Sequence, residues 1–373
     1  MVEVSGVVWS RSRRIAFRYG VVFAALLLFP FPLGLIPPTA GLAELLGTPW
    51  AWGVAWFAEA VLGIPAPAAA MTGSGDTTWA YVQLLMTTLL AGLGAAGWTL
   101  IDRRRLAYPR LEATALVALR YFLASMLLGY GLAKVFPTQF PPPSLGRLDQ
   151  PVGELSPMGL LWTFMGHSTP YTIFSGLVEA LAGVLLLWRR TTLLGALIAI
   201  AVMTNVVALN LCYDVPVKLF SMELLLVAVL IALPHARRLA AALLGIATVA
   251  VAPRVRGSAR SERVCRAAKL AALTAFAVAG YEQYQRAQTF PPPPNELHGT
   301  WVVASFTADG VERPPLLTDD QRWRKLIVSE YGVSARLMTD QRVRFPGATV
   351  DPEARTITLP PAPAPAPPAP ALA

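Results

Sequence analysis

Residues 171–188 are YTIFSGLVEALAGVLLLW, and residues 193–211 are LLGALIAIAVMTNVVALNL. A helix needs about 20 mainly apolar residues to cross the hydrocarbon core of a bilayer, so each run predicts a membrane span. The two runs nevertheless contain Glu179, Asn205 and Asn210. Polar side chains at membrane depth are costly, and they usually face a protein interior or a water-filled cavity. The stretch therefore predicts a helical membrane protein with a polar site inside its bundle.

The composition of the whole chain agrees with this prediction. Of the 373 residues 55% are hydrophobic and 14% are charged, whereas about a quarter of the residues in soluble domains are charged. Pro30 and Pro32 mark the end of a first span, because proline cannot donate to the helical ladder. Alternatively, this first segment is a signal peptide with its cleavage region at residues 39–43. We expect seven spans, at residues 15–33, 80–101, 111–136, 171–188, 193–211, 220–233 and 267–284.

Basic residues lie in the gaps between the apolar segments. They cluster at residues 11–14, 103–105, 189–190, 237–238 and 254–269, and residues 37–80 contain neither lysine nor arginine. This positive-inside pattern predicts a multi-pass protein of the bacterial inner membrane with a cytoplasmic N-terminus. The net charge of +9 is therefore a topology signal. We expect the lipid bilayer as a partner, and no nucleic acid.

Two outer segments are predicted to carry short helices. Trp50, Trp52 and Trp56 in the first outer loop favour a short helix at the membrane interface, where aromatic rings concentrate. The loop ends in GSGDTT at residues 73–78, which predicts a turn and an N-cap for the next helix. The apolar run at residues 158–165 is too short to span a bilayer, which leaves a re-entrant or an interfacial segment.

The segment after the sixth span is apolar but short. Counting residues 240–252 as a span would put the basic residues 254–269 outside, against the positive-inside rule. We therefore expect a cytoplasmic surface helix there.

A change in character follows residue 290. Residues 290–295, FPPPPN, predict a semi-rigid linker. Alternating apolar and polar residues then predict an extracytoplasmic β-domain with strands at residues 299–307, 323–328, 333–338 and 356–359, and with a turn at Asp309-Gly310. A closed lipocalin-like barrel takes about eight strands, so the domain is either incomplete or docked onto the bundle. A proline-rich tail starts at residue 360.

Polar residues between the third and sixth spans are expected to gather in the outer half of the bundle. On the helix at residues 171–188, Gly176, Glu179 and Gly183 share one face, which would let a neighbouring helix approach closely. One hypothesis makes the gathered residues structural, with Lys218 paired to Asp214 or Glu223 and the asparagines bonding between helices. The other makes them a ligand or proton site. The set comprises Lys134, Arg147, Asp149, His167, Glu179, Asn205, Asn210, Asp214, Lys218 and Glu223.

Two arginines inside spans are expected to play other roles. Arg18 lies close enough to the interface to extend its guanidinium toward it. Arg120 either pairs with Glu112 or reaches the interface in the same way.

No recognisable motif binds a cofactor or a metal. The three histidines lie on different segments, which disfavours a haem or zinc site. Cys212 and Cys265 fall on opposite sides of the predicted membrane, so we expect no disulfide between them. The sequence also lacks phosphate-loop, dinucleotide-binding and nucleophile-elbow motifs. The chain is thus not expected to be an enzyme on its own.

Four features stand between residues 119 and 238: GYGLAKVF at 129–136, the acid-bearing helix at 176–183, the arginine pair at 189–190, and NVVALNLCYDVPVK at 205–218. Together they resemble the DoxX-like family of bacterial integral membrane proteins. The resemblance implies a four-helix core and, as in some members, an accessory subunit of a quinone-linked redox system. A quinone and membrane redox partner subunits are the cofactor and partners that it implies. The two extra N-terminal spans, the long outer loop and the β-domain depart from that family.

Three functions follow as hypotheses. The first is the DoxX-like accessory subunit, the second a non-enzymatic envelope protein that anchors a partner-binding β-domain, and the third a small-molecule transporter. The transporter ranks last because the polar residues do not continue to the inner side. The expected parts are residues 1–110 (two spans), 111–238 (DoxX-like core), 239–289 (basic segment and last span), 290–360 (β-domain) and 361–373 (tail).

Overall fold

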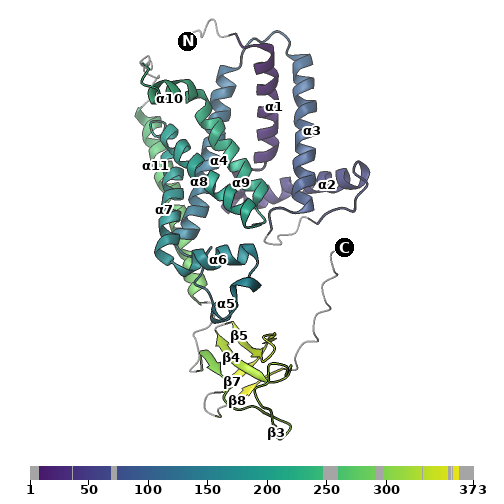
Figure 1. Ribbon diagram of the computed structural model, residues 1–373. Helices are drawn as coiled ribbons and strands as arrows, with labels where there is room; N and C mark the ends of the chain where they lie inside the picture. Colours follow the sequence, from purple (N-terminus) through teal and green to yellow (C-terminus); the bar gives the residue numbers. More distant parts are fainter. Residues whose placement is uncertain are drawn as a thin grey trace. The chain divides into compact units, whose positions relative to one another are not determined.

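The computed structural model describes residues 8–35, 37–68, 74–246, 259–289, 297–329, 331–351, 354 and 356–360 (Figure 1). The chain divides into two compact units. The first comprises Met1–Val135 and Phe174–Ala277, and the second comprises Phe136–Ile173 and Val278–Ala373. The predicted linker at 290–295 and the tail beyond 360 lie outside the described residues.

Within the described ranges, seven helical segments are long and apolar enough to cross a membrane. All seven predicted spans are thereby confirmed as helices of the required length and composition, which indicates a membrane protein. The helices are α1 (Arg11–Leu28), α3 (Thr78–Ile101), α4 (Pro109–Val135), α7 (Thr169–Leu186), α8 (Thr192–Cys212), α9 (Lys218–Ala232) with its continuation α10 (Ala236–Leu243), and α11 (Ala259–Thr289).

Local sequence explains where several of these helices begin and end. The Ser10 hydroxyl caps α1 by accepting a hydrogen bond from Arg13 N, and α1 ends at Leu28 before the two prolines, as predicted. The Thr77 hydroxyl caps α3, so the N-cap expected in GSGDTT is confirmed. Where a helix was expected at 240–252, α10 begins earlier, at Ala236, and ends at Leu243; residues 247–252 lie outside the described chain.

The helix predicted around the tryptophans is longer than expected. Helix α2 (Ala40–Ala60) contains Pro49 and lies across the ends of α1 and α3 (Figure 1). Its Val54 and Phe57 pack on Val82 and Met86 of α3, whereas Trp52 and Trp56 are exposed. An apolar inner face therefore holds α2 on α3, and exposed indole rings cover its outer side.

Four helices share the largest core of the first unit. The buried side chains come from α4, α7, α8 and α9, the helices that contain the DoxX-like motifs. Fully buried examples are Leu123 and Leu127 of α4, Leu186 of α7 and Ala199 of α8. In a bilayer such helices are held by close packing rather than by removal of apolar surface from water.

The second unit combines the segment between α4 and α7 with the C-terminal strands. That segment holds α5 (Leu145–Leu148), a 3-10 turn (Val152–Glu154) and α6 (Pro157–His167). With 11 residues, α6 is too short to span a bilayer, as predicted. The hydroxyls of Ser144 and Ser156 cap the two α-helices.

The described C-terminal residues form eight strands, more than the sequence predicted. The strands are β1 (Gly299–Val302), β2 (Thr307–Ala308), β3 (Val311–Glu312), β4 (Trp323–Ser329), β5 (Gly332–Leu337), β6 (Arg342–Phe345), β7 (Thr349–Asp351) and β8 (Thr356–Thr358). The strand expected at 299–307 is wrong, because the chain breaks into β1 and β2. The expected Asp309-Gly310 turn joins β2 to β3, and both residues have positive φ, as this tight hairpin turn requires.

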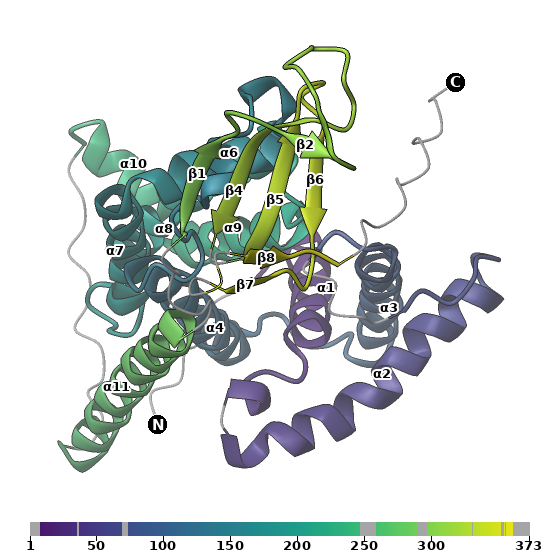
Figure 2. The same ribbon diagram turned by 90° about the horizontal axis from the view of Figure 1, so that it is seen from below.

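The eight strands do not make one barrel. Four of them form an antiparallel sheet in the order β1-β4-β5-β6, shown side by side in Figure 2, and the others form the pairs β2-β3 and β7-β8. The core of this part contains Val328, Val333, Ala335 and Phe345, with Trp323 packed against them. In the described residues the four-stranded sheet is therefore open, with β1 and β6 at its edges.

Candidate functional site

Helices α4 and α7 approach each other closely through glycines. A Cβ on Gly131 would lie 2.6 Å from the backbone nitrogen of Ala180, and a Cβ on Gly183 would lie 3.0 Å from the carbonyl oxygen of Ala124. A Cβ on Gly176 would lie 2.7 Å from the Cβ of Lys134. The small-residue face predicted on this helix is therefore confirmed, and α4 is the neighbour that it admits.

The close approach brings a buried ion pair together. Lys134 Nζ of α4 donates a hydrogen bond to Glu179 Oε2 of α7. The two side chains are 10% and 5% exposed, respectively. Each charge neutralises the other in a place where neither could remain alone, because an unpaired buried charge costs several kcal/mol.

A second group of charges surrounds the start of α9. Lys218 Nζ lies 2.7 Å from Asp214 Oδ1, so the predicted Lys218–Asp214 pair is confirmed. The carboxylate of Asp76, from the loop before α3, accepts hydrogen bonds from the backbone nitrogens of Lys218 (2.9 Å) and Leu219 (3.0 Å). Asp76 therefore caps α9, a helix about 140 residues further along the chain. The alternative partner, Glu223, has no ion pair among the described residues.

The two asparagines of α8 occupy different environments. Asn210 is buried, and its Nδ2 has no hydrogen-bond partner in the described chain. Asn205 is exposed on the outside of α8. Neither side chain makes a hydrogen bond to another helix within the described ranges, so the expectation that they join helices is not met there.

Arg18 and Arg120 have partners other than the expected ones. Arg18 is only 3% exposed and donates to Tyr108 Oη, Thr99 Oγ1 and the backbone oxygen of Asp102. Glu112 pairs with Arg13 at 3.0 Å and is thus not the partner of Arg120. Arg120 is 6% exposed and donates to Thr192 Oγ1 at 3.3 Å. The expected Arg120–Glu112 pair is therefore wrong, because a helix contact that the sequence does not show supplies Thr192 as the acceptor. The reach of the two guanidinium groups to the interface stays a prediction.

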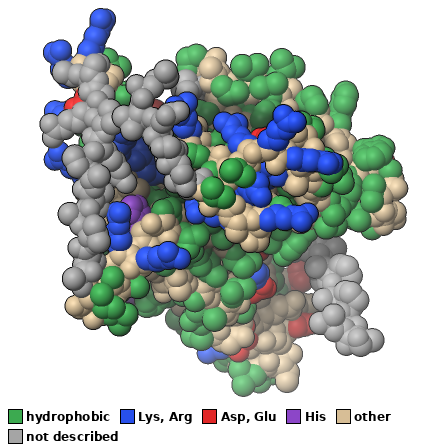
Figure 3. Space-filling model, turned by 90° about the horizontal axis from the view of Figure 1, so that it is seen from above, with side chains coloured by type: hydrophobic (Ala, Val, Ile, Leu, Met, Phe, Trp, Pro, Cys, Tyr) green, Lys and Arg blue, Asp and Glu red, His purple; other side chains and the backbone are tan. Residues whose placement is uncertain are grey.

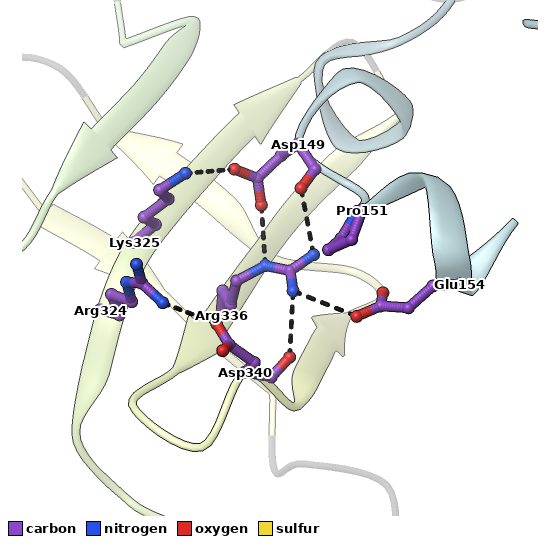
Figure 4. Close-up of a pocket in the computed structure, with 7 residues that line it drawn as sticks. All are labelled: Asp149, Pro151, Glu154, Arg324, Lys325, Arg336 and Asp340. Carbon is purple, nitrogen blue, oxygen red and sulfur yellow. Dashed lines mark hydrogen bonds and ion pairs between the residues drawn. The ribbon is translucent and has the colours of Figure 1, made fainter. Parts of the chain in front are cut away.

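In the second unit, Asp149 joins the outer loop to the sheet (Figure 4). Its Oδ1 lies 2.6 Å from Lys325 Nζ of β4, and its Oδ2 accepts a hydrogen bond of 2.9 Å from Arg336 Nε of β5. Arg336 Nη2 also donates to the backbone oxygen of Asp149. Burial by itself would raise the pKa of Asp149, but the hydrogen bonds and charges of Lys325 and Arg336 outweigh it and lower that pKa.

The same contact borders an open polar pocket of about 260 Å³. In Figure 4 the guanidinium of Arg336 also lies against Glu154 Oε1 at 3.6 Å and the backbone oxygen of Asp340 at 3.2 Å. Charged groups of both signs thus face the pocket, and most of them are already paired. Its lining comprises Asp149, Pro151, Glu154, Arg324, Lys325, Arg336 and Asp340.

Arg342 makes a second link between loop and sheet. Its Nη1 donates to the carbonyl oxygen of Gly146 at 3.1 Å, and its Nη2 donates to Ser334 Oγ at 3.2 Å. Burial and the neighbouring charges of Arg344 and Arg336 lower the pKa of Arg342. The sheet surface under the loop therefore carries concentrated positive charge.

Arg147 and His167 contribute little to these networks. Arg147 Nη1 bonds to Gln150 Oε1 at 3.2 Å within its own loop. His167 is exposed at the end of α6. Of the ten predicted residues, the ion pairs of the described chain join Lys134 with Glu179 and Asp214 with Lys218, and Asp149 bonds to Lys325 and Arg336 of the sheet. A single site made of all ten residues stays a prediction.

Comparison with known proteins gives one informative similarity. The chain is 40% identical over 114 residues to the uncharacterised protein YwoB of Bacillus subtilis (strain 168), and the match covers 30% of this chain and 71% of YwoB. The chain belongs to the YwoB family. No family model matches the chain, and no solved structure matches it. Because YwoB is itself uncharacterised, membership of the YwoB family assigns no activity, and the DoxX-like resemblance stays a prediction.

Sequence reasoning missed several residues of these sites in this YwoB-family chain. Asp76 was expected to serve only its own turn, and nothing in the sequence connects it with α9. Lys325 and Arg336 carried one usable signal, since two cations on neighbouring strands need an anion if they pair across the sheet. Their register was not predictable, because it depends on the β4–β5 hairpin.

Proposed function

We propose that this YwoB-family chain is a non-enzymatic envelope protein, whose helices anchor a partner-binding β-domain in the bacterial inner membrane. By the positive-inside rule its N-terminus is cytoplasmic and its β-domain extracytoplasmic. The observation that carries the proposal is the bond network of Asp149 with Lys325 and Arg336. It makes the loop between two spans and the β-strands parts of one compact unit.

The β-domain is connected to the rest of the second unit at two points. Residues 278–289 of α11 reach it from one side of the sequence, and the loop between α4 and α7 bonds to it through buried charges. A domain that were only tethered by a linker would need no such contact. Fixing the sheet on the loop therefore supports a role in presenting a surface rather than in moving freely.

The surface that we assign to a partner is the free edge of β1. Within the described sheet β1 pairs only with β4, so its outer backbone groups are open to another strand. Trp301 and Val302 of this edge are 50% and 76% exposed. An exposed edge strand with apolar side chains is a template for pairing with an extended segment of another protein.

The test is photo-crosslinking in intact cells that express the full-length chain. A photoreactive amino acid at position 301 is expected to give a discrete protein adduct. The same group at Tyr331, which is 60% exposed in the β4–β5 turn, is the matched control. Identical adducts from both positions would show that β1 is no specific binding edge. If a chain truncated after residue 289 restores the phenotype of a deletion strain as well as the full-length chain does, the proposal as a whole is refuted.

A second candidate is the accessory subunit of a quinone-linked redox system that the DoxX-like resemblance implies. The buried Lys134–Glu179 pair favours it, because it lies within the resembling segment at a helix contact. Haem or flavin would come from partner subunits. Unchanged quinone-dependent electron transfer in a purified complex that carries Glu179→Gln would exclude this role for the pair.

A further inference from the structure

The turn between α7 and α8 leaves the first turn of α8 without a cap. The Thr191 hydroxyl, at the N-cap position, donates to Leu185 O at 2.6 Å, and the Thr192 hydroxyl donates to Trp188 O at 2.9 Å. Neither hydroxyl accepts a bond from the first backbone N–H groups of α8. A helix start with free N–H groups carries partial positive charge and attracts anions.

A buried cation lies at the same helix start. Arg120 of α4 is 6% exposed, and its Nη1 donates to Thr192 Oγ1, on the first residue of α8. Within the described residues its Nε has no hydrogen-bond partner and no carboxylate pairs with its guanidinium. The Tyr121 ring covers one side of the group, 4.8 Å from the guanidinium carbon. A buried guanidinium without an anion is costly, so this place favours a negatively charged ligand.

The surroundings suit a ligand from the bilayer. Arg189 and Arg190 of the turn are exposed, and Lys269 Nζ of α11 lies 5.9 Å from the centre of the Trp188 ring. Figure 3 looks onto the end of the molecule at which α1 begins, and Lys and Arg side chains are spread over this face. Leu194, in the first turn of α8, is 53% exposed and offers apolar surface to acyl chains.

We propose that Arg120 and the first turn of α8 bind the phosphate group of an anionic phospholipid. Phosphate oxygens accept hydrogen bonds from the free N–H groups of α8 and from the guanidinium, which is the arrangement that helix starts and arginines use for phosphate. The exposed arginines of the turn add attraction at the headgroup level. The lipid supplies the anion that the buried Arg120 lacks.

The test is native mass spectrometry of the full-length protein with equal amounts of phosphatidylglycerol and phosphatidylcholine. The wild type is expected to retain phosphatidylglycerol. Arg120→Gln is expected to weaken this retention about tenfold, which corresponds to 1.4 kcal/mol. Arg237→Gln is the matched control, since it removes the same charge from an exposed side chain of α10. Equal losses in both variants would overturn the proposal, because they would reflect bulk charge.

Thermal unfolding in detergent distinguishes binding of the lipid from binding of free phosphate. It also shows whether each variant is folded. Phosphatidylglycerol is expected to raise the Tm of the wild type, because a ligand that binds the native state stabilises it. Arg120→Lys keeps the charge but replaces the planar fork of donors by a single nitrogen, so we expect a smaller rise. Stabilisation by inorganic phosphate alone, without a preference among lipids, would overturn the assignment to a phospholipid.

Discussion

Lys325 and Arg336 stand directly opposite each other in the β4–β5 register, and each bonds to a different oxygen of one carboxylate, that of Asp149. Like charges in directly paired positions destabilise a sheet. Asp149 removes that repulsion from outside the sheet. The contact is therefore needed by the strands as well as by the loop.

Asp149→Ala is expected to loosen the second unit by roughly 3 kcal/mol, because it leaves the buried Arg336 beside Lys325 with only the half-exposed Glu154 as an ion-pair partner. Hydrogen exchange of the loop and of β4–β5 in the full-length protein measures the effect. Asp340→Asn is the control: its pair with Arg324 is exposed and asparagine tolerates the positive φ at this position, so a change below about 1 kcal/mol is expected. Equal protection in wild type and Asp149→Ala would contradict this role.

The Asp149 network also predicts a dependence on acid. The pKa of Asp149 is lower in the folded unit than its ordinary value of 3.8. Its contribution is therefore fully present above that value, and it is lost as the pH falls below 3.8 toward the folded pKa. Proteolysis of the second unit should accelerate in this window. Asp149→Asn should remove part of the acid sensitivity; the remainder comes from other carboxylates, such as Asp319, whose pKa is also lowered.

Gly131→Ala is expected to destabilise the helix bundle by roughly 1–3 kcal/mol, the usual effect of forcing extra volume into a packed interior. The added Cβ would lie 2.6 Å from the nitrogen of Ala180, so α4 and α7 must move apart. Gly129→Ala is a matched control two residues away, where a Cβ meets nothing within 4 Å. Thermal unfolding in detergent compares the two. A larger effect at Gly129 would contradict the packing described here.

Removing one partner of the Lys134–Glu179 pair should cost more than removing both. Glu179→Leu alone leaves a buried ammonium group and is expected to cost roughly 3 kcal/mol or more. The double variant Lys134→Met, Glu179→Leu should recover most of this loss, since apolar side chains often replace a buried pair without cost. Thermal unfolding of these two variants and of Lys134→Met alone closes the double-mutant cycle. If the double variant is the least stable, the cost of the single variants does not come from an unpaired buried charge.

Asp76→Ala is expected to lower stability by roughly 1 kcal/mol, because α9 loses its N-cap. The loss should appear as faster hydrogen exchange at Lys218 and Leu219, because their backbone N–H groups donate hydrogen bonds to the Asp76 carboxylate. Asp214→Asn is the control, since it removes an exposed partner of Lys218 but tolerates the positive φ at this position. Unchanged exchange at the start of α9 in Asp76→Ala would argue against the cap.

The sequence by itself determined the membrane class and the seven spanning segments, because each span must bury about 20 apolar residues whatever its neighbours are. It also determined the close face of Gly176 and Gly183, since residues three and four apart share a helix side. The end of α1 before the prolines, the Thr77 cap and the Asp309-Gly310 turn were also predictable, because each of these features depends only on residues that are neighbours in the chain.

Only the tertiary structure decided which charges meet. Asp76 caps a helix that starts at Lys218, and Asp149 neutralises two strands more than 170 residues away. Arg120 bonds to Thr192 rather than to Glu112, eight residues before it in the chain. Partners of this kind depend on how helices and strands pack, and hydrophobic periodicity identifies a buried face without saying which element covers it. The sequence therefore named several of the charged residues but not the partner of each.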